Sequence, residues 1–308
     1  MCMNNKVVYA VIVSWNGGKW IRRALESLQK SSVALRTVIV DNASTDDTVD
    51  IVQAGFNDVE VLTMPANLGF GNAANQGIRH ALSQGADYVL LVNQDARIAP
   101  GTVEGLTALL EKHQDFGIVS PLSLTYEGDE IDHKFLQNVQ GSKDLISDIF
   151  LDKMKTLYDV AFVPAAVWLL SRRILEQVGG FDPVFFMYGE DNDYCNRARY
   201  HGFKIGLAPR AMAYHDHGKT AEKSYSFDRY ANKFYSECVL RLKRPDHRFF
   251  LSFTGLVATM LQRSVVFLGS LDVKKLAATV CAFSRASGNI FHIRRHRIRC
   301  RQKGRGWF

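Results

Sequence analysis

Cysteine is scarce and scattered in this chain of 308 residues. The five cysteines are Cys2, Cys195, Cys238, Cys281 and Cys300. Because they are odd in number and include no CxxC pair, they argue against a disulfide framework and a zinc site and favour a reducing compartment. The N-terminal residues also lack the basic stretch, apolar core and small-residue cleavage site of a secretory signal. We therefore expect a cytoplasmic protein.

Long apolar runs are also missing. The most apolar segment, 251–271, is interrupted by Gln262 and Arg263, so we expect no run of the ~18–20 apolar residues that a spanning helix needs. The net charge of +7 is concentrated near the end, where residues 294–305 read RRHRIRCRQKGR. We interpret this amphipathic stretch and basic cluster as a helix on an anionic membrane surface, peripheral to the inner face of the cytoplasmic membrane. There are two alternatives: a packed helical appendage with a solvated tail, and a tail that binds nucleic acid.

Short apolar runs alternate with helical patterns through the first two hundred residues. Three runs have the apolar character of buried strands, residues 7–13, 37–40 and 88–92, and residues 59–62 are a shorter strand. This β-α-β-α order predicts an α/β fold with an open, doubly wound, mostly parallel sheet. We interpret residues 123–158 as a variable insertion, because they are rich in charge and weak in periodicity. Because the pattern changes to amphipathic helix near Pro245, we divide the chain into an α/β domain (1–240) and a C-terminal amphipathic helical region with a basic tail (241–308).

Polar residues stand at the ends of these strands. Ser14, Asp41 and Asp95 follow buried runs, and in doubly wound sheets ligands bind beyond the carboxyl ends of the strands. The segment Gly69–Ala74 reads G-x-G-x-x-A, but it follows the third strand rather than the first, which argues against a nicotinamide cofactor. Glycines in a tight turn that opens a helix still allow a phosphate or sugar to approach the backbone.

Three polar segments are candidates for chemistry. Asp95 is either a helix cap or a ligand for a hard cation such as Mg²⁺, which prefers one or two carboxylates plus substrate phosphates. Glu190 or Asp191, at an acidic helix start, is either a general base or simply a helix-stabilising charge. His215 and His217 point to opposite faces of a strand end, so we do not expect them to share one metal ion.

Seven segments together form a pattern that is more specific than any single motif. They are VIVSWN (11–16), VDNASTDDT (40–48), NLGFGNAANQGI (67–78), LVNQDA (91–96), GGFDPVFF (179–186), GEDNDYCNR (189–197) and HDHGKT (215–220). In this order and spacing the chain resembles family 2 glycosyltransferases, in particular the subgroup that includes rhamnosyltransferases of cell-surface polysaccharide assembly. The resemblance extends over residues 6–220 and implies the GT-A fold.

The resemblance also implies a nucleotide-sugar site. Its residues would be Ser14, Asn16, Asp41, Asn67, Gly69, Asn93 and Asp95. Asp41 matches the acid that reads the nucleotide base. Asp95, in the D-x-D position where Asn93 replaces the first acid, would bind the Mg²⁺ or Mn²⁺ that bridges the diphosphate. His215 fits an H-x-x-G-x-[ST] pattern whose histidine can complete the metal shell.

The activity implied is that of an inverting, metal-dependent hexosyltransferase. Asp191 matches the catalytic base, and Glu190 would help to position the acceptor. We expect a dTDP- or UDP-sugar donor, rhamnose first, and a saccharide or lipid-linked saccharide acceptor in polysaccharide or lipopolysaccharide synthesis, with no nucleic-acid partner. Two alternatives remain. One is a sugar-phosphate nucleotidyltransferase, which usually carries a basic, Gly-rich loop after the first strand. The other is a basic nucleic-acid-binding protein, whose charge should spread over a folded face.

Overall fold

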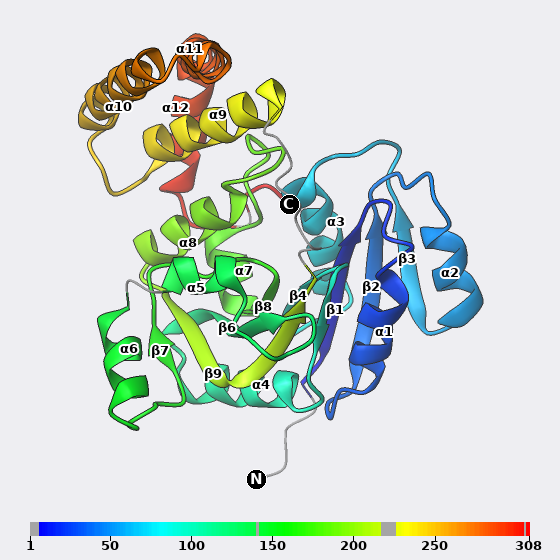
Figure 1. The fold of residues 1–308 in the computed structure, drawn as a ribbon. Helices are drawn as coiled ribbons and strands as arrows, with labels where there is room; N and C mark the ends of the chain where they lie inside the picture. The colour runs from blue at the N-terminus through cyan, green and yellow to red at the C-terminus, as the bar shows by residue number, and fades with distance from the viewer. Residues whose placement is uncertain (1–5, 140–141, 217–225, 305) are drawn as a thin grey trace.

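The computed structural model describes residues 6–139, 142–216, 226–304 and 306–308 (Figure 1). Strands and helices alternate through its first part. They are β1 (Val8–Ser14), α1 (Ile21–Gln29), β2 (Leu35–Asp41), α2 (Thr48–Gly55), β3 (Val59–Thr63), α3 (Phe70–Ser83) and β4 (Tyr88–Asn93). β1 pairs in parallel with β2 and with β4, and β2 pairs in parallel with β3. The carboxyl ends of all four strands therefore meet at one edge of the sheet.

Beyond β4 the sheet becomes mixed. The further elements are β5 (Ala96–Ile98), α4 (Thr102–Lys112), β6 (Phe116–Thr125), α5 (His133–Val139), α6 (Lys143–Phe150), β7 (Tyr158–Asp159), β8 (Val167–Ser171), α7 (Arg172–Val178), α8 (Glu190–Tyr200) and β9 (Lys204–His215). The strand order is β3-β2-β1-β4-β8-β6-β9-β5, with β7 paired to β9. β8 runs antiparallel to β4, whereas β6 runs parallel to β9. The predicted open α/β sheet is confirmed, and the segment 123–158 contributes to it the end of β6 and the first residue of β7.

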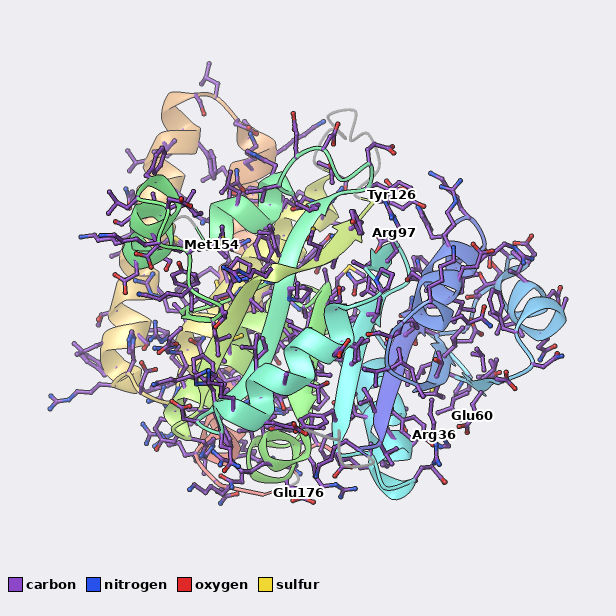
Figure 2. All side chains as sticks on the ribbon, turned by 90° about the horizontal axis from the view of Figure 1, so that it is seen from below. Arg36, Glu60, Arg97, Tyr126, Met154 and Glu176 are labelled. Atoms are coloured by element: carbon purple, nitrogen blue, oxygen red, sulfur yellow. The ribbon has the colours of Figure 1, made fainter. Side chains whose placement is uncertain are left out.

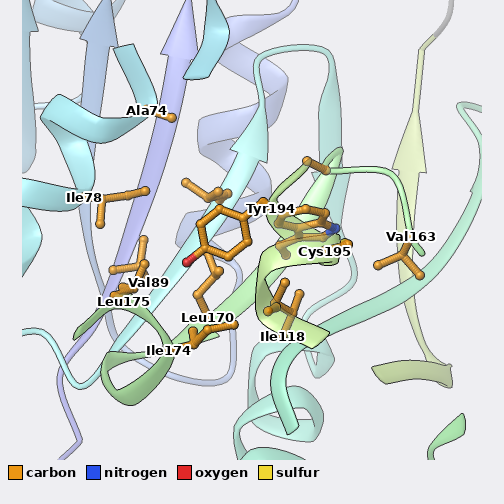
Figure 3. Close-up of a cluster of buried hydrophobic side chains, with 14 of the residues drawn as sticks. Ala74, Ile78, Val89, Ile118, Val163, Leu170, Ile174, Leu175, Tyr194 and Cys195 are labelled. Carbon is orange, nitrogen blue, oxygen red and sulfur yellow. The ribbon is translucent and has the colours of Figure 1, made fainter. Parts of the chain in front are cut away.

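Buried clusters cover both faces of this sheet. The cluster on the α3 and α8 side includes Tyr194 and Cys195 of α8, which point into it (Figure 3). Tyr194 is fully buried, and its hydroxyl donates to the Gly179 carbonyl at 3.0 Å. A buried aromatic ring whose hydroxyl has a partner is a strong anchor. The packing thus fixes α8, which begins with Glu190 and Asp191.

Four helices form a separate layer beyond α8 (Figure 1). They are α9 (Phe227–Lys243), α10 (Phe249–Gly269), α11 (Val273–Gly288) and α12 (Ile290–Cys300). α9 packs against the other three, around a buried cluster of their own. Because α9 is continuous across residues 240 and 241, we propose that the helical unit begins with α9.

The basic C-terminal segment is packed against the chain. Arg297 of α12 is buried and donates to the Leu242 carbonyl at 3.3 Å. Arg301 donates to the Pro245 carbonyl at 2.8 Å, and Phe308 packs on the cluster of the α3 side. The chain end lies beside α3 (Figure 1). The backbone of this segment is thus helical and packed, with Arg297 and Arg301 bound to carbonyls near the end of α9, whereas Arg294, Arg295 and Arg299 remain exposed.

α10 corrects a second expectation. Gln262 and Arg263 do not interrupt it, and in the described part of the chain it is the one helix long and apolar enough, by length and composition, to cross a membrane. Its buried residues are Ser252 and Leu256. Arg263 donates to Glu237 of α9 at 2.7 Å. Arg263 thus faces α9, and apolar positions of α10 such as Val265 and Leu268 are exposed.

Candidate active site

Polar groups meet where β1, β2 and β4 end. The parallel register sets Ser14 beside Asp41, and Asn93 ends β4 next to β1. Ser14 is buried, and its hydroxyl donates to Gln94 Oε1 at 2.8 Å. Asp41 is also buried and accepts the Ser44 N–H at 3.3 Å. Gln94, which the sequence did not single out, therefore ties the end of β4 to β1.

Asn16 connects the loop after β1 to the loop after β2. Its φ of 50° lies in the left-handed region, which asparagine tolerates better than most residues. Its N–H donates to Ser44 Oγ at 3.0 Å, and its Oδ1 accepts the Thr45 N–H at 2.8 Å. Ser44 thereby links Asn16 to Asp41 in one network.

The loop Asn67–Gly69 is held by Asn42, another residue that the sequence did not single out. The Asn42 amide donates to Asn67 Oδ1 at 3.0 Å and accepts the Leu68 N–H at 2.8 Å. Gly69 has a φ of 77°, and a Cβ there would stand 2.0 Å from the Phe186 carbonyl oxygen. Only glycine fits such a position. This contact joins the polar edge of the sheet to the segment that leads into α8.

Asp95 and His215 are 120 residues apart in the sequence and touch in the structure. The register of β5 and β9 sets Ala96 opposite His215, and the Asp216 N–H donates to the Asp95 carbonyl at 2.9 Å. His215 Nε2 then lies 3.2 Å from Asp95 Oδ1. His217 lies outside the described residues.

Arg97 fixes this pairing from the other face of β5. Its guanidinium lies 3.8 Å from the centre of the Tyr214 ring, which is its partner in the β5–β9 register. It also donates to the Tyr126 carbonyl at 2.6 Å, and Figure 2 shows the two side by side. Contacts between a guanidinium and aromatic faces are favourable. They hold β5 on β9 and so keep Asp95 beside His215.

The Asp95–His215 pair fits a divalent cation. Adjacent ligands of an octahedral ion, each about 2.1 Å from it, stand about 3 Å apart, which is close to the 3.2 Å between these two atoms. The side chain of Asp95 is 28% exposed and that of His215 10%. The partial exposure of Asp95 would let oxygens of a substrate reach a cation held by this pair.

Glu190 and Asp191 begin α8 on the wall of a cavity of about 400 Å³. Gly189, with a φ of 91°, turns the chain sharply just before them. Burial, and then the charge of Asp191, raise the pKa of Glu190 to about 7. Burial also raises the pKa of Asp191, and backbone hydrogen bonds from Asn192 and Ala165 oppose that rise.

The same cavity collects side chains from distant segments. His215 reaches it from β9, Asp132 and Lys134 from the segment 123–158, and Lys233 from α9. Asp132 Oδ2 also lies 4.0 Å from His215 Nδ1. No local pattern in the sequence marks Asp132 or Lys233, because their place depends on packing between elements.

The structure connects the predicted site residues to different degrees. Asp191, Glu190 and His215 line the one cavity. Asp95 is not among its lining residues and joins it through His215. The residues of the polar edge approach α8 through the contact of Gly69 with Phe186.

Comparison with known proteins places this geometry in context. The family model described as Glycosyl transferase family 2 matches residues 9–179. The chain is 25% identical over 232 residues to an N-acetylglucosaminyl-diphospho-decaprenol L-rhamnosyltransferase of Mycobacterium tuberculosis, covering 68% of this chain and 76% of the relative. It is 24% identical over 220 residues to the dTDP-rhamnosyl transferase RfbF of Shigella flexneri, covering 71% and 72%.

Solved structures share the fold. TarS 1-349 of S. aureus in complex with UDP-GlcNAc superposes with a TM-score of 0.58 at 18% identity, covering 96% of this chain and 89% of that one. The mannosyltransferase PcManGT of Pyrobaculum calidifontis, in complex with GDP-Man and Mn²⁺, gives a TM-score of 0.58 at 16% identity, covering 94% and 88%. The predicted GT-A fold is confirmed. The comparisons support neither a nucleotidyltransferase nor a nucleic-acid-binding protein.

Proposed function

The chain belongs to glycosyl transferase family 2, and we propose that it transfers one hexose, with inversion, from a nucleoside-diphosphate sugar to a saccharide hydroxyl. The reaction serves the synthesis of a cell-surface polysaccharide or lipopolysaccharide. The observation that carries this proposal is the cavity that both Asp191 and His215 line, with Asp95 in contact with His215. A carboxylate base thus stands near a pair of ligands suited to a cation-bound diphosphate.

We assign the nucleotide of the donor to the polar edge of the sheet. The buried Asp41 carboxylate would accept the imide N–H that uracil and thymine share, so it does not choose between UDP and dTDP. Ser14, Asn16, Asn67 and Gly69 surround the same edge and would shape the pocket. Because two relatives are named rhamnosyltransferases, and one of them a dTDP-rhamnosyl transferase, dTDP-rhamnose is our first candidate donor and a UDP-hexose the second.

Asp95 and His215 would hold the metal ion, Mg²⁺ or Mn²⁺. When bound, it neutralises the negative charge that develops on the departing diphosphate. Asn93 stands where the family pattern has an acid, so the protein contributes a single carboxylate at this position. The arrangement suits a hard cation, which binds through one or two carboxylates together with substrate phosphates.

Asp191 would accept the proton of the acceptor hydroxyl while the hydroxyl oxygen attacks the anomeric carbon. The new C–O bond forms opposite the bond to the diphosphate, which breaks, and the anomeric configuration inverts. Asn192 and Ala165 bond the Asp191 carboxylate through their backbones and favour its charged form. Glu190 Oε2 is buried without a hydrogen-bond partner among the described residues. We therefore propose that the Glu190 carboxyl group is protonated near neutral pH. Its O–H would then donate a hydrogen bond to the acceptor saccharide.

A panel of nucleotide sugars tests this function. The purified protein is incubated with dTDP-rhamnose, UDP-glucose, UDP-N-acetylglucosamine and GDP-mannose, with and without Mn²⁺, and thermal stabilisation and donor hydrolysis are measured. We expect a dTDP- or UDP-sugar to act in a cation-dependent way and NMR of the product to show inverted configuration. A retained configuration, or no response to any nucleotide sugar, contradicts the proposal.

We further propose that the protein lies on the inner face of the cytoplasmic membrane. α10 exposes Phe250, Leu261, Val265 and Leu268 at helical spacing, each more than half exposed. Its other side is tied to α9 by the ion pair of Arg263 with Glu237. A helix bound along one side and apolar on the other is suited to the membrane interface.

A further inference from the structure

A second hollow, of about 640 Å³, adjoins the catalytic cavity. The two share Asn192 of α8 and Glu237 and Leu240 of α9 as lining residues. In Figure 1, α9 lies over α8 and leads into α10 at the same end of the molecule. Because Asn192 directly follows Asp191, a ligand that extends from one hollow into the other passes the proposed base.

Basic side chains dominate this second hollow, here called the basic hollow. They are Arg241, Arg244, His247 and Arg248. Glu237, the acid among the lining residues, is paired with Arg263 at 2.7 Å. Arg244 is paired with Asp246 at 2.6 Å, whereas the Arg248 guanidinium has no ion pair or hydrogen bond with another described side chain. The basic hollow therefore carries net positive charge and favours an anion.

Ser252 provides an independent sign of a ligand. It lines the basic hollow and is only 4% exposed. Its Oγ is buried with no hydrogen-bond partner among the described residues, and a buried hydroxyl without a partner is unfavourable. Ser252 lies in the first turn of α10, which begins at Phe249. There the free backbone N–H groups and the helix dipole also attract an anion.

The basic hollow borders the apolar side of α10. Leu251 lines it and is 63% exposed. Leu261, Val265 and Leu268 continue the exposed apolar surface along the helix. A soluble nucleotide has no apolar group that could cover this surface. A lipid phosphate has both: its phosphate suits the basic hollow, and its hydrocarbon chain suits the apolar side of α10.

We propose that the basic hollow binds the diphosphate of a long-chain lipid that carries the acceptor saccharide. The proposal rests on the transferase function and specifies the class of its acceptor. The diphosphate lies among Arg241, Arg248 and Ser252, and the hydrocarbon chain follows α10. The attached sugar then passes Asn192 and reaches Asp191.

Arg248→Glu tests the proposal, because this side chain is exposed and unpaired and its loss spares the fold. Transfer is measured to one saccharide in two forms, as a lipid diphosphate in detergent micelles and as an uncharged octyl glycoside. Replacing a charge-assisted contact by a repulsive one should raise KM for the lipid diphosphate about tenfold or more. KM for the octyl glycoside and for the donor should stay unchanged.

Two further variants sharpen this test. Ser252→Ala removes the unpartnered hydroxyl without changing charge, and it should raise KM for the lipid diphosphate about threefold or more. Arg79→Glu makes the same charge change as Arg248→Glu on the exposed surface of α3 and should leave every KM unchanged. Phosphatidylglycerol micelles should compete with the lipid diphosphate far more weakly than unglycosylated lipid diphosphate does.

Several outcomes overturn the proposal. Equal KM changes for both acceptors, or for Arg79→Glu as well, show that the effect does not pass through the diphosphate. Unchanged KM in both Arg248→Glu and Ser252→Ala, or equal competition by phosphatidylglycerol, also rejects it. If the wild-type protein transfers to neither acceptor and hydrolyses no donor, the transferase function itself fails, and the acceptor assignment fails with it.

Discussion

Glu190 and Asp191 are neighbours in the chain but differ in what surrounds their carboxylates. Asp191 accepts the Asn192 N–H at 2.7 Å, whereas Glu190 Oε2 is buried and unpartnered among the described residues. The sequence predicted both as site residues from their place in one motif. It did not predict the raised pKa of Glu190, because the burial that causes it requires the complete fold around the start of α8.

Glu190→Gln should stabilise the protein more at pH 8 than at pH 5.5. The pKa of Glu190 is raised from 4.5 in the unfolded chain to about 7 in the folded protein. Between these two pH values the folded state keeps the proton and the unfolded state does not, so the stability of wild type falls as the pH rises through this range. Glutamine does not titrate. The advantage of the variant should therefore grow by about 2 kcal/mol between the two pH values, as urea unfolding measures. An advantage that is independent of pH contradicts the assigned pKa.

Asp95→Ala should remove the effect of the metal on donor binding. Wild type should bind the donor nucleotide more tightly with Mn²⁺ than without it, because Asp95 and His215 together supply the ligands. The variant should lose most of that difference, at least about tenfold in affinity, while its metal-free affinity stays the same. Calorimetry with and without Mn²⁺ measures both. If the two proteins respond equally to Mn²⁺, the Asp95 assignment is wrong.

Residues that position the site were harder to predict than residues with chemical function. Asn42 lies within the motif at residues 40–48, and Gln94 lies between Asn93 and Asp95, yet neither was assigned a role. Each acts by hydrogen bonds to a loop distant in the sequence. Such a role follows from the strand register, which a single sequence does not specify.

At the scale of elements, a buried cluster of charges joins α9 and α12 to α8. Lys243 of α9 is fully buried and pairs with Asp193 of α8 at 2.6 Å and with Asp182. Burial alone would raise the pKa of Asp182, but the charges of Lys243 and His296 lower it instead. Asp182 and Asp193 also have, with Cys300, the spacing of a metal site. The Lys243 ammonium already pairs with both carboxylates, so we interpret the cluster as a structural connection.

Lys243→Met should destabilise the protein by about 3–5 kcal/mol, because it removes the buried cation that Asp182 and Asp193 share. The pairs of Asp193 with Arg197 and of Asp182 with His296 remain in the variant. Lys274→Met, at an exposed position of α11, is the matched control and should change stability by less than about 0.5 kcal/mol. Urea unfolding of the three proteins measures the difference. Equal midpoints for Lys243→Met and wild type would falsify the structural role of the cluster.

The elements themselves were predictable to different extents. Three of the four parallel strands, β1, β2 and β4, were found because each is an apolar run that is largely buried. β3 is shorter and only partly buried, and Glu60 interrupts its apolar residues. β5 and β7, of three and two residues, are too short to carry a periodic signal. The segment 123–158, expected to be an insertion, also contains residues of the cavity wall such as Asp132 and Lys134. They were not predicted as such, since charged residues line a site as readily as they cover a surface.

At the scale of the whole molecule, the helical layer stands against the catalytic domain and exposes one apolar side. The sequence predicted a helical region with a basic end on a membrane surface, and it left a packed appendage with a solvated tail as an alternative. In the structure the guanidinium groups of Arg297 and Arg301 donate to backbone carbonyls, and Phe308 packs on a buried cluster. Part of the charge of this basic end is therefore engaged within the chain, and the proposed membrane contact rests mainly on α10.

The double substitution Val265→Ser and Leu268→Ser should weaken membrane binding. Both side chains are at least 60% exposed, so the change removes apolar contact with lipid without disturbing a core. Wild type should float with vesicles that contain phosphatidylglycerol, and the variant should float much less. Arg79→Glu controls for surface changes elsewhere. A wild-type protein that remains at the bottom of the gradient with these vesicles contradicts the proposed location.

Donor binding and proton abstraction are assigned to different groups of residues, and Asp191→Asn separates the two functions. The isosteric amide cannot accept the proton, so kcat should fall by about 10³-fold, within the range of general-base catalysis. The affinity for the donor with Mn²⁺, measured by calorimetry, should change by less than about twofold, because the substitution removes none of the contacts that bind the donor before the reaction. Turnover close to that of wild type in a folded Asp191→Asn protein would contradict the account.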